Sequence, residues 1–373
     1  MPMRIPWIAV IVTGLVASGG VRAADPSQRA VSINFVEPIP TPVPTAEPTP
    51  IPSEGEDSRI GQLAQQVPSF DTGEDCEPPG RGKAGFIAYA EFLHWQPHAL
   101  STDFATVVDP ATLTPGYTES LGMDRTNGFR VGLGYRFTDT CCDFTWNFTS
   151  YHGHGETTLG SNGGTVGLLA PHSVYATMPM DSIEAVDTLQ LNVHDFELNW
   201  RFPLNETVGF RALAAFRWAT LDEDFVNNYT YLINATGSVH MPIKMDAGGL
   251  RLGAEVQWQS PWGFQLFGRG AESILVGSFR SRRQESDSLH GPLADVLETS
   301  TKIVPVVEAA LGARWTRGPL AIDAGYELSD WFNLAGTVPV QPAAVPGKAV
   351  VPLVSQPQSL FLEGCFVRLT YTR

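Results

Sequence analysis

From residue 85 onward, large apolar side chains occupy every second position in successive segments of the chain. In one of these segments, 129–137, the odd positions are aromatic or aliphatic and the even positions are Gly or Arg. The pattern returns in three further segments: 143–149, 208–218 and 249–259. Successive side chains of a β-strand point to opposite faces, so each segment predicts a strand with one apolar and one polar face.

Ten candidate strands follow one another along the chain, at about 85–95, 124–137, 142–152, 188–202, 207–220, 245–259, 262–277, 301–315, 319–330 and 358–372. Four of the connections between them are short: 138–141, 203–206, 260–261 and 316–318. The other five are long: 96–123, 153–187, 221–244, 278–300 and 331–357. Short turns at one end and long loops at the other are typical of an outer-membrane barrel. We therefore expect an all-β fold, a transmembrane antiparallel up-and-down β-barrel of about ten strands, with twelve as the alternative, over residues 84–373.

A closed barrel satisfies every backbone N–H and C=O inside hydrocarbon, because it has no unpaired edge. Aromatic residues near the strand ends would form the girdles at the two membrane interfaces. They are Trp95, Tyr135, Phe137, Trp200, Phe202, Trp218, Trp258, Trp262, Trp315, Trp331 and Tyr371. The alternative is a soluble β-sandwich with the same aromatic residues in its core.

The first 23 residues have the three parts of a secretory signal peptide. Arg4 precedes the apolar stretch 5–16, and Ala23 supplies the small residue that a signal peptidase needs. A single membrane helix is the alternative, but glycines at 14, 19 and 20 shorten the apolar run. We expect residues 1–23 to be removed during export.

Residues 24–83 predict a disordered, Pro-rich and acidic arm. Seven prolines between residues 38 and 52 alternate with small or apolar residues. Proline fixes φ and lacks an N–H, so this tract favours extended polyproline II and cannot join a sheet. We expect a periplasmic linker, with the cell wall as a candidate partner.

The composition excludes two classes of function. With 24 basic and 39 acidic side chains the net charge is −15, which argues against a nucleic-acid partner. A hydrophobic share of 43% without repeated apolar runs excludes a helical protein that crosses the membrane many times.

Charged residues on the face opposite the apolar one would line the barrel interior. This predicted lumen set is Arg130, Arg136, Arg211, Arg217, Arg251, Glu255, Arg269, Glu272, Glu308, Arg314, Asp323, Glu327 and Arg368. Ten strands enclose little more than the eight-strand barrel that side chains fill, so Arg–carboxylate pairs would narrow it. Two irregularities stand out. A bulge near His194–Asp195 would reconcile the two parities of 188–202, and Glu363 falls on the apolar parity of its strand.

Other candidate sites are weaker. His152 and His154 lie two residues apart without a further clustered ligand, so we expect no metal site. Together with Asp222 and Asp330 they could form a hydrolase site at the outer rim, but the sequence pairs none of them. Phosphate loops, nucleophile elbows and dinucleotide fingerprints do not occur, and we expect neither a cofactor nor an enzyme.

Three of the four cysteines are disulfide candidates: Cys76, Cys141 and Cys142. An exported chain can form disulfides. Adjacent cysteines rarely bond each other because the ring is strained. We expect Cys76 to bond with Cys141 or Cys142, which would tether the arm beneath the barrel.

Several motifs in order along the chain resemble the Legionella-type pore-forming major outer membrane protein family. They are Ala90–Trp95, Phe264–Gly277, Ala324–Glu327 with Trp331-Phe332, and Phe361–Leu369. The resemblance covers about 85–373 and implies a pore-forming outer-membrane barrel. One departure is the last residue, Arg373, where assembly machinery commonly reads an aromatic residue.

The sequence thus predicts a narrow, charge-lined passive channel in the outer membrane of a diderm bacterium. Long loops would be extracellular and the N-terminal arm periplasmic. The partners would be outer-membrane lipid and the barrel-assembly machinery. The alternatives are a structural or adhesive surface barrel with little transport, and a hydrolase located at the rim.

Overall fold

The computed structural model describes residues 84–373, apart from 100–102, 113, 139–140, 162–165, 176–177, 232–233, 261, 263 and 337–356. The predicted signal peptide and arm, residues 1–83, lie outside the described residues. No helix among the described residues is long and apolar enough to cross a bilayer.

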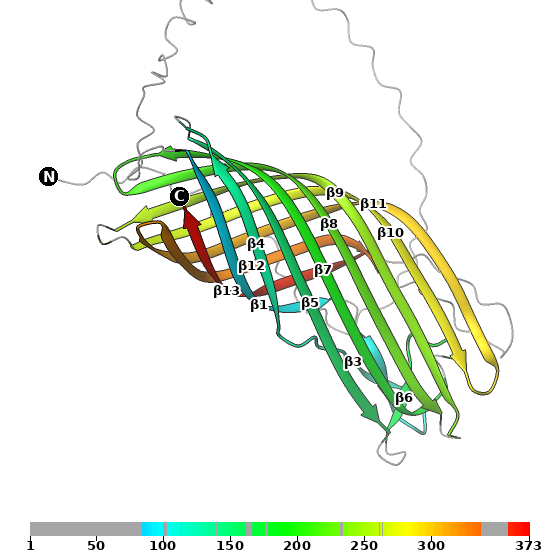
Figure 1. Ribbon diagram of the computed structural model, residues 1–373. Helices are drawn as coiled ribbons and strands as arrows, with labels where there is room; N and C mark the ends of the chain where they lie inside the picture. The colour runs from blue at the N-terminus through cyan, green and yellow to red at the C-terminus, as the bar shows by residue number, and fades with distance from the viewer. Residues whose placement is uncertain are drawn as a thin grey trace, which may run out of the picture. The chain divides into compact units, whose positions relative to one another are not determined.

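Within the described ranges, thirteen strands form one antiparallel sheet (Figure 1). They are β1 (Gly85–Ala99), β2 (Asp103–Val108), β3 (Pro115–Ser120), β4 (Thr126–Arg136), β5 (Cys142–Gly160), β6 (Gly167–Leu169), β7 (Met180–Pro203), β8 (Val208–Tyr231), β9 (Thr236–Gln259), β10 (Phe264–Asp287), β11 (Gly291–Arg317), β12 (Leu320–Ala335) and β13 (Pro357–Thr372). Ten of them close into a ring, which the β1–β13 and β7–β8 pairings complete. The remaining three, β6, β2 and β3, continue the sheet from the outer end of β7.

The predicted all-β barrel with ten ring strands is confirmed. Tight connections join β8 to β7, β10 to β9 and β12 to β11 at one end of the ring, which we call the turn end. In the last of these turns Gly318 has φ +61°, a conformation that glycine adopts without a Cβ clash. The opposite end is called the hairpin end.

The outer face of the ring carries an apolar band. Its exposed side chains include Phe92, Phe129, Leu133, Phe196, Leu198, Phe216, Leu250, Leu252, Val256, Ile274, Val276, Ile303, Leu311, Ile322, Val367 and Leu369. At the edge of the band nearer the hairpin end, Trp218 Nε1 donates to Asp246 Oδ1 at 2.7 Å. Beyond this level the outward side chains of β8 become Thr220, Asp222 and Asp224. The band therefore marks the part of the ring that contacts lipid.

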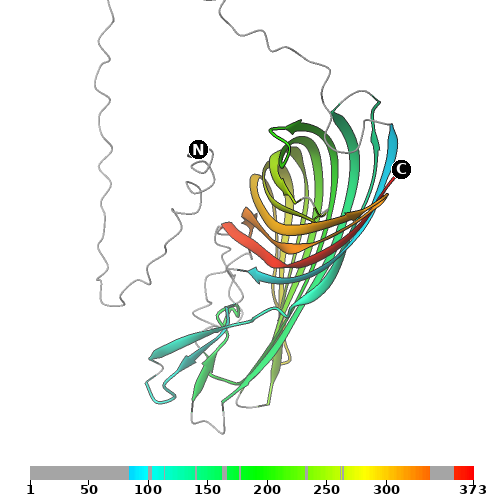
Figure 2. The same ribbon diagram turned by 90° about the vertical axis from the view of Figure 1, so that its left-hand side faces the viewer.

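Six strands, β5 and β7 to β11, continue well beyond the band and make one side of the ring taller (Figures 1 and 2). β7 to β11 have 24 to 27 residues and β5 has 19, against 11 to 16 in β1, β4, β12 and β13. We call this part the extension: residues 151–160, 180–191, 220–231, 236–246, 278–287 and 291–301. The predicted long loops 221–244 and 278–300 are therefore wrong, because most of their residues are paired strand.

The predicted bulge near His194–Asp195 is also wrong. β7 pairs with β5 and β8 without a register shift there; its only shift lies between Met180 and Ser182. Leu189, Leu191 and Val193 are buried inside the ring, whereas Phe196 and Leu198 face lipid. The apolar side chains change from one face of β7 to the other because the environment of the strand changes. The interior is apolar around 189–193, whereas the exterior is apolar, facing lipid, around 196–198.

The interior consists of two layers of different chemistry. Charged side chains occupy the half nearer the turn end. Above them is a buried apolar layer, supplied by nine of the ten ring strands: Leu93, Trp95, Tyr151, Leu189, Leu191, Val193, Ala219, Leu221, Ile243, Met245, Ala247, Leu275, Phe279, Val304, Val306, Trp331, Leu334, Leu360 and Leu362. The apolar layer fills the ring at the level where the lipid-facing band ends.

A second apolar cluster lines the inner face of the extension. Phe225, Tyr229, Val239 and Met241 of the extension pack with Phe104 of β2. Residues of β6 and the segment 170–175 belong to the same cluster. The added strands thus cover the inner face of the extension.

Candidate functional site

Twelve of the thirteen predicted lumen residues point into the ring. They are Arg130, Arg136, Arg211, Arg217, Arg251, Glu255, Arg269, Glu308, Arg314, Asp323, Glu327 and Arg368. The interior assignment of Glu272 is wrong. Its side chain is exposed on the outer face, where its register partners are Leu252 and Val307. The reason is parity: no bulge separates Glu272 from Arg269, so residues three apart face opposite sides.

Glu91 of β1 is the centre of one group of ion pairs. It is buried and accepts hydrogen bonds from both Arg130 and Arg368. Arg130 Nη2 also lies 3.3 Å from Glu327 Oε1. The guanidinium of Arg368 lies over the ring of Tyr89, 4.3 Å from its centroid. One carboxylate thus compensates two cations that come from strands on either side of β1.

Glu308 of β11 is the centre of a second group. Its Oε2 atom lies 3.0 Å from Arg217 Nη1 and 2.7 Å from Arg251 Nε. Arg217 donates to both oxygens of Asp195, at 2.7 and 2.9 Å. Arg251 Nη1 donates to Glu197 Oε1 at 2.5 Å. Such forked contacts fix the guanidinium planes and give buried charges their compensation.

Three further ion pairs lie nearest the turn end: Arg211–Glu255 (2.9 Å), Arg314–Asp323 (2.7 Å) and Arg201–Asp143 (2.6 Å). Among the described residues Arg136 forms no ion pair. All these pairs together are called the charge lattice.

Sequence reasoning missed five members of the charge lattice: Glu91, Asp143, Asp195, Glu197 and Arg201. Their parity could have identified them. Glu91 alternates with Phe92, and Glu197 lies between the lipid-facing Phe196 and Leu198. Each therefore had to point inward once its neighbours were assigned to lipid.

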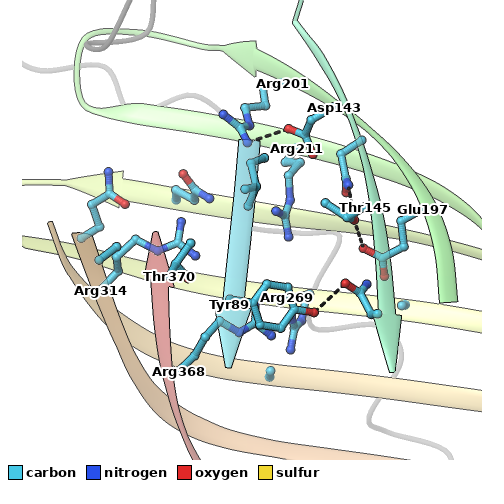
Figure 3. Close-up of a pocket in the computed structure, with 18 of the residues that line it drawn as sticks. Tyr89, Asp143, Thr145, Glu197, Arg201, Arg211, Arg269, Arg314, Arg368 and Thr370 are labelled. Atoms are coloured by element: carbon cyan, nitrogen blue, oxygen red, sulfur yellow. Dashed lines mark hydrogen bonds and ion pairs between the residues drawn. The ribbon is translucent and has the colours of Figure 1, made fainter. Parts of the chain in front are cut away.

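A cavity of about 700 Å³ lies within the charge lattice (Figure 3). The turns at 203–209 and 318–321 line its mouth, so it opens at the turn end. Its inner end is formed by Trp95, Leu191, Val193, Trp331 and Leu362 of the apolar layer. Charges therefore line the half of the ring interior nearer the turn end.

Two tryptophans mark the boundary between the two layers. The Arg130 guanidinium lies 5.8 Å from the Trp95 ring centroid, and that of Arg217 lies 5.9 Å from the Trp331 ring centroid. An aromatic face attracts a cation on one side and packs against aliphatic groups on the other. These rings therefore suit the transition from charged cavity to apolar layer.

The four candidates for a rim hydrolase do not come together. His152, His154 and Asp222 lie on the outer face of the wall, where Asp222 Oδ1 is 2.9 Å from Lys244 Nζ. Asp330 lies on β12, which is not adjacent to β5 or β8 in the ring. No group of three His, Cys, Asp or Glu side chains that could hold a metal occurs in the described part of the chain.

The extension contains buried titratable groups that the sequence did not suggest. Glu285 accepts hydrogen bonds from Ser173 Oγ (2.7 Å), Val174 N (2.9 Å) and Tyr229 Oη (3.0 Å). Burial raises the pKa of Glu285, although these donors oppose the shift. The hydrogen bonds from Ser173 and Val174 to Glu285 hold the segment 170–175 against the wall of the extension.

Asp187 is fully buried on β7, and neither of its side-chain oxygens has a hydrogen-bond partner among the described residues. Burial, and then the charges of Glu223 and Asp224, raise its pKa to about 8. Burial raises the pKa of Glu223 to about 7. These carboxyl groups are therefore stabilised in their protonated form.

Cys141 is disulfide-bonded. Cys76 lies outside the described residues, so the predicted tether to the arm stays a prediction. Cys365 carries a free thiol on the outer face.

Comparison with known proteins places this architecture in a family. Residues 82–372 match the family of the Legionella pneumophila major outer membrane protein precursor. No curated protein matches the chain. The chain belongs to this outer-membrane protein family.

Several solved outer-membrane proteins are similar in structure. The crystal structure of the outer membrane protease OmpT from Escherichia coli is 8% identical and covers 78% of this chain and 97% of its own, with a TM-score of 0.48. The Pseudomonas putida toluene transporter TodX is 9% identical, with coverages of 80% and 91% and a TM-score of 0.26. A Pseudomonas aeruginosa FadL homologue is 10% identical, with coverages of 78% and 90% and a TM-score of 0.22.

Proposed function

We propose that this outer-membrane barrel is a narrow passive channel, in which the apolar layer is the constriction. Outer-membrane barrels have short periplasmic turns and longer extracellular loops, so the turn end faces the periplasm in this proposal. The charged cavity is then a periplasmic vestibule, and the extension stands above the cell surface.

The observation that carries the proposal is the cavity of about 700 Å³ that opens at one end and stops at the apolar layer. A cavity lined by charged groups holds water, whereas an apolar constriction of a channel excludes it. The charge lattice keeps the interior arginines compensated next to a low-dielectric wall.

The ring is too small for a general porin. Ten strands are close to the eight at which side chains fill the interior, and far from the 16 to 18 that leave an open aqueous channel. The expected conductance is therefore small. Large, nonselective openings from the purified protein would contradict a narrow channel.

Planar-bilayer recording tests the constriction. The Trp331→Ala variant removes one of the two tryptophans of the apolar layer that lie next to the charge lattice. We expect it to raise the single-channel conductance several-fold over the wild type. The Phe216→Ala variant is the matched control, because it removes an aromatic ring from the lipid face and leaves the interior intact.

A second candidate is a structural surface barrel without transport. The apolar layer favours it, since nine ring strands contribute to a continuous buried cluster. This candidate predicts that neither the wild type nor Trp331→Ala conducts ions or accelerates the swelling of proteoliposomes. That result, with both proteins folded, would overturn the channel.

A further inference from the structure

The mouth of the cavity contains more cationic surface than its ion pairs suggest. Arg201 of β7 and Arg211 of β8 are direct register partners, and both side chains line the cavity. Like charges directly opposite each other on neighbouring strands are destabilising. Arg314 and Arg136 line the same cavity (Figure 3 labels the first). We call Arg136, Arg201, Arg211 and Arg314 the arginine ring.

The carboxylates that compensate the arginine ring lie behind it. The side chains of Arg201, Arg211 and Arg314 are 33, 18 and 21% exposed. Those of their partners Asp143, Glu255 and Asp323 are 3, 2 and 1% exposed, respectively. In these three pairs a solute in the cavity therefore meets mainly the guanidinium groups, although Asp143 also lines the cavity.

Two members of the arginine ring also have unused donors. The Nε atoms of Arg136 and Arg211 are buried and have no hydrogen-bond acceptor among the described residues. Arg136, moreover, has no ion-pair partner in the described part of the chain. A buried donor without an acceptor costs free energy, so the wall does not fully satisfy either guanidinium group.

One acidic residue at the mouth comes from a turn and not from a strand of the barrel wall. Glu206 lines the cavity from the turn 204–207 and is exposed. Water and salt screen an exposed charge much more than a buried one. Gln257, Gln259 and Thr370 are neutral groups that line the same cavity.

We propose that the arginine ring is a binding site for small multivalent oxyanions of the phosphate or pyrophosphate type. The guanidinium fork donates two parallel hydrogen bonds to two oxygens of one phosphate. Four guanidinium groups around one mouth can engage several oxygens at once, which favours a multivalent over a monovalent anion. This inference rests on the proposed channel, because it names the class of solute that the vestibule concentrates.

Isothermal titration of the folded full-length chain in a neutral detergent at low salt tests the site. Pyrophosphate is the probe, and acetate is the monovalent comparison. We expect saturable binding of pyrophosphate and binding of acetate at least about tenfold weaker. The Arg136→Gln and Arg201→Gln variants should each weaken pyrophosphate binding about tenfold, as expected for the loss of a hydrogen bond to a charged group.

Arg282→Gln is the matched control. Arg282 forms a forked pair with Asp295 on the outer face of the extension, and its loss should leave pyrophosphate binding unchanged. Arg136→Gln breaks no ion pair among the described residues, so it should fold even if Arg201→Gln does not. Absence of saturable binding by the wild type, or wild-type binding by both ring variants, would overturn the site. The titration in detergent does not depend on ion conduction. A bilayer recording without channel openings would therefore reject the proposed channel but not the binding site.

Discussion

Tyr89 and Asn147 form a hydrogen bond across the strand that lies between them. Tyr89 Oη of β1 donates to Asn147 Oδ1 of β5 at 2.7 Å. β4 separates these two strands in the ring, and the tyrosine passes over it at Gly132. A Cβ atom on Gly132 would lie 2.2 Å from Tyr89 Cε1 and 2.7 Å from Asn147 Oδ1. The glycine is therefore required for this crossing.

We expect Gly132→Ala to destabilise the barrel by about 1–3 kcal/mol, because the added methyl group displaces the Tyr89 ring. Urea unfolding in detergent, followed by tryptophan fluorescence, measures the change. Gly209→Ala is the control, since a Cβ there has nothing within 4 Å. The cost of Gly132→Ala should shrink in a Tyr89→Leu background. Equal costs in both backgrounds would contradict this contact.

A pair of glutamates on neighbouring strands tests the charge lattice. Glu308→Gln leaves Arg217 and Arg251 without their shared carboxylate, and we expect a loss of about 3–5 kcal/mol in unfolding free energy. Glu272→Gln removes a charge from the lipid face and should leave stability unchanged or higher. Unfolding in lipid bilayers compares the two. Similar effects from both variants would mean that the lattice contributes little.

The extension should lose stability as the pH rises. The pKa of Asp187 is raised from 3.8 to about 8, so the folded extension keeps a proton that the unfolded chain releases above about pH 4. Unfolding therefore becomes more favourable between about pH 4 and pH 8. Hydrogen exchange in β7 and β8, corrected for intrinsic rates, should show less protection at pH 8 than at pH 5. Asp187→Asn should reduce this difference and leave the part that Glu223 contributes, and an unchanged difference would assign it to other groups.

The disulfide of Cys141 should join the barrel to the N-terminal arm. The chain has four cysteines, and the predicted partner is Cys76. Peptide mapping without reductant should yield a Cys76–Cys141 linked peptide, and Cys141→Ser should leave the arm open to proteolysis. A Cys76 peptide that alkylates fully in the oxidised protein would refute the tether.

The period-two pattern predicted the ring strands because lipid outside and charge inside impose opposite chemistry on the two faces. It failed in the extension, where the exterior is polar and the interior apolar. There Leu189 and Leu191 resemble lipid-facing residues in the sequence although they are buried inside. Periodicity reports that two faces differ, but it does not say which face is inside.

The contacts of Glu363 with neighbouring strands could not be predicted from the pattern along its own strand. Glu363 lies on the outward parity of β13, where it accepts a hydrogen bond from Tyr326 Oη at 2.9 Å and lies 3.2 Å from His98 Nε2. Both partners belong to neighbouring strands that are far away in sequence. The cavity and its arginine ring likewise depend on distant pairs such as Arg201 and Arg211. Such contacts follow from register, which the sequence of a single strand does not specify.

The pairing of β1 with β13 makes the last residues of the chain the seam of the cylinder. Arg373 N still donates to Phe86 O at 3.0 Å, one residue beyond the final strand. In the nascent protein the outer edge of β1 therefore stays unpaired until β13 has been synthesised. Removal of β13 would open the closed barrel and expose the edges of β1 and β12, which would then be free to pair with strands of other chains.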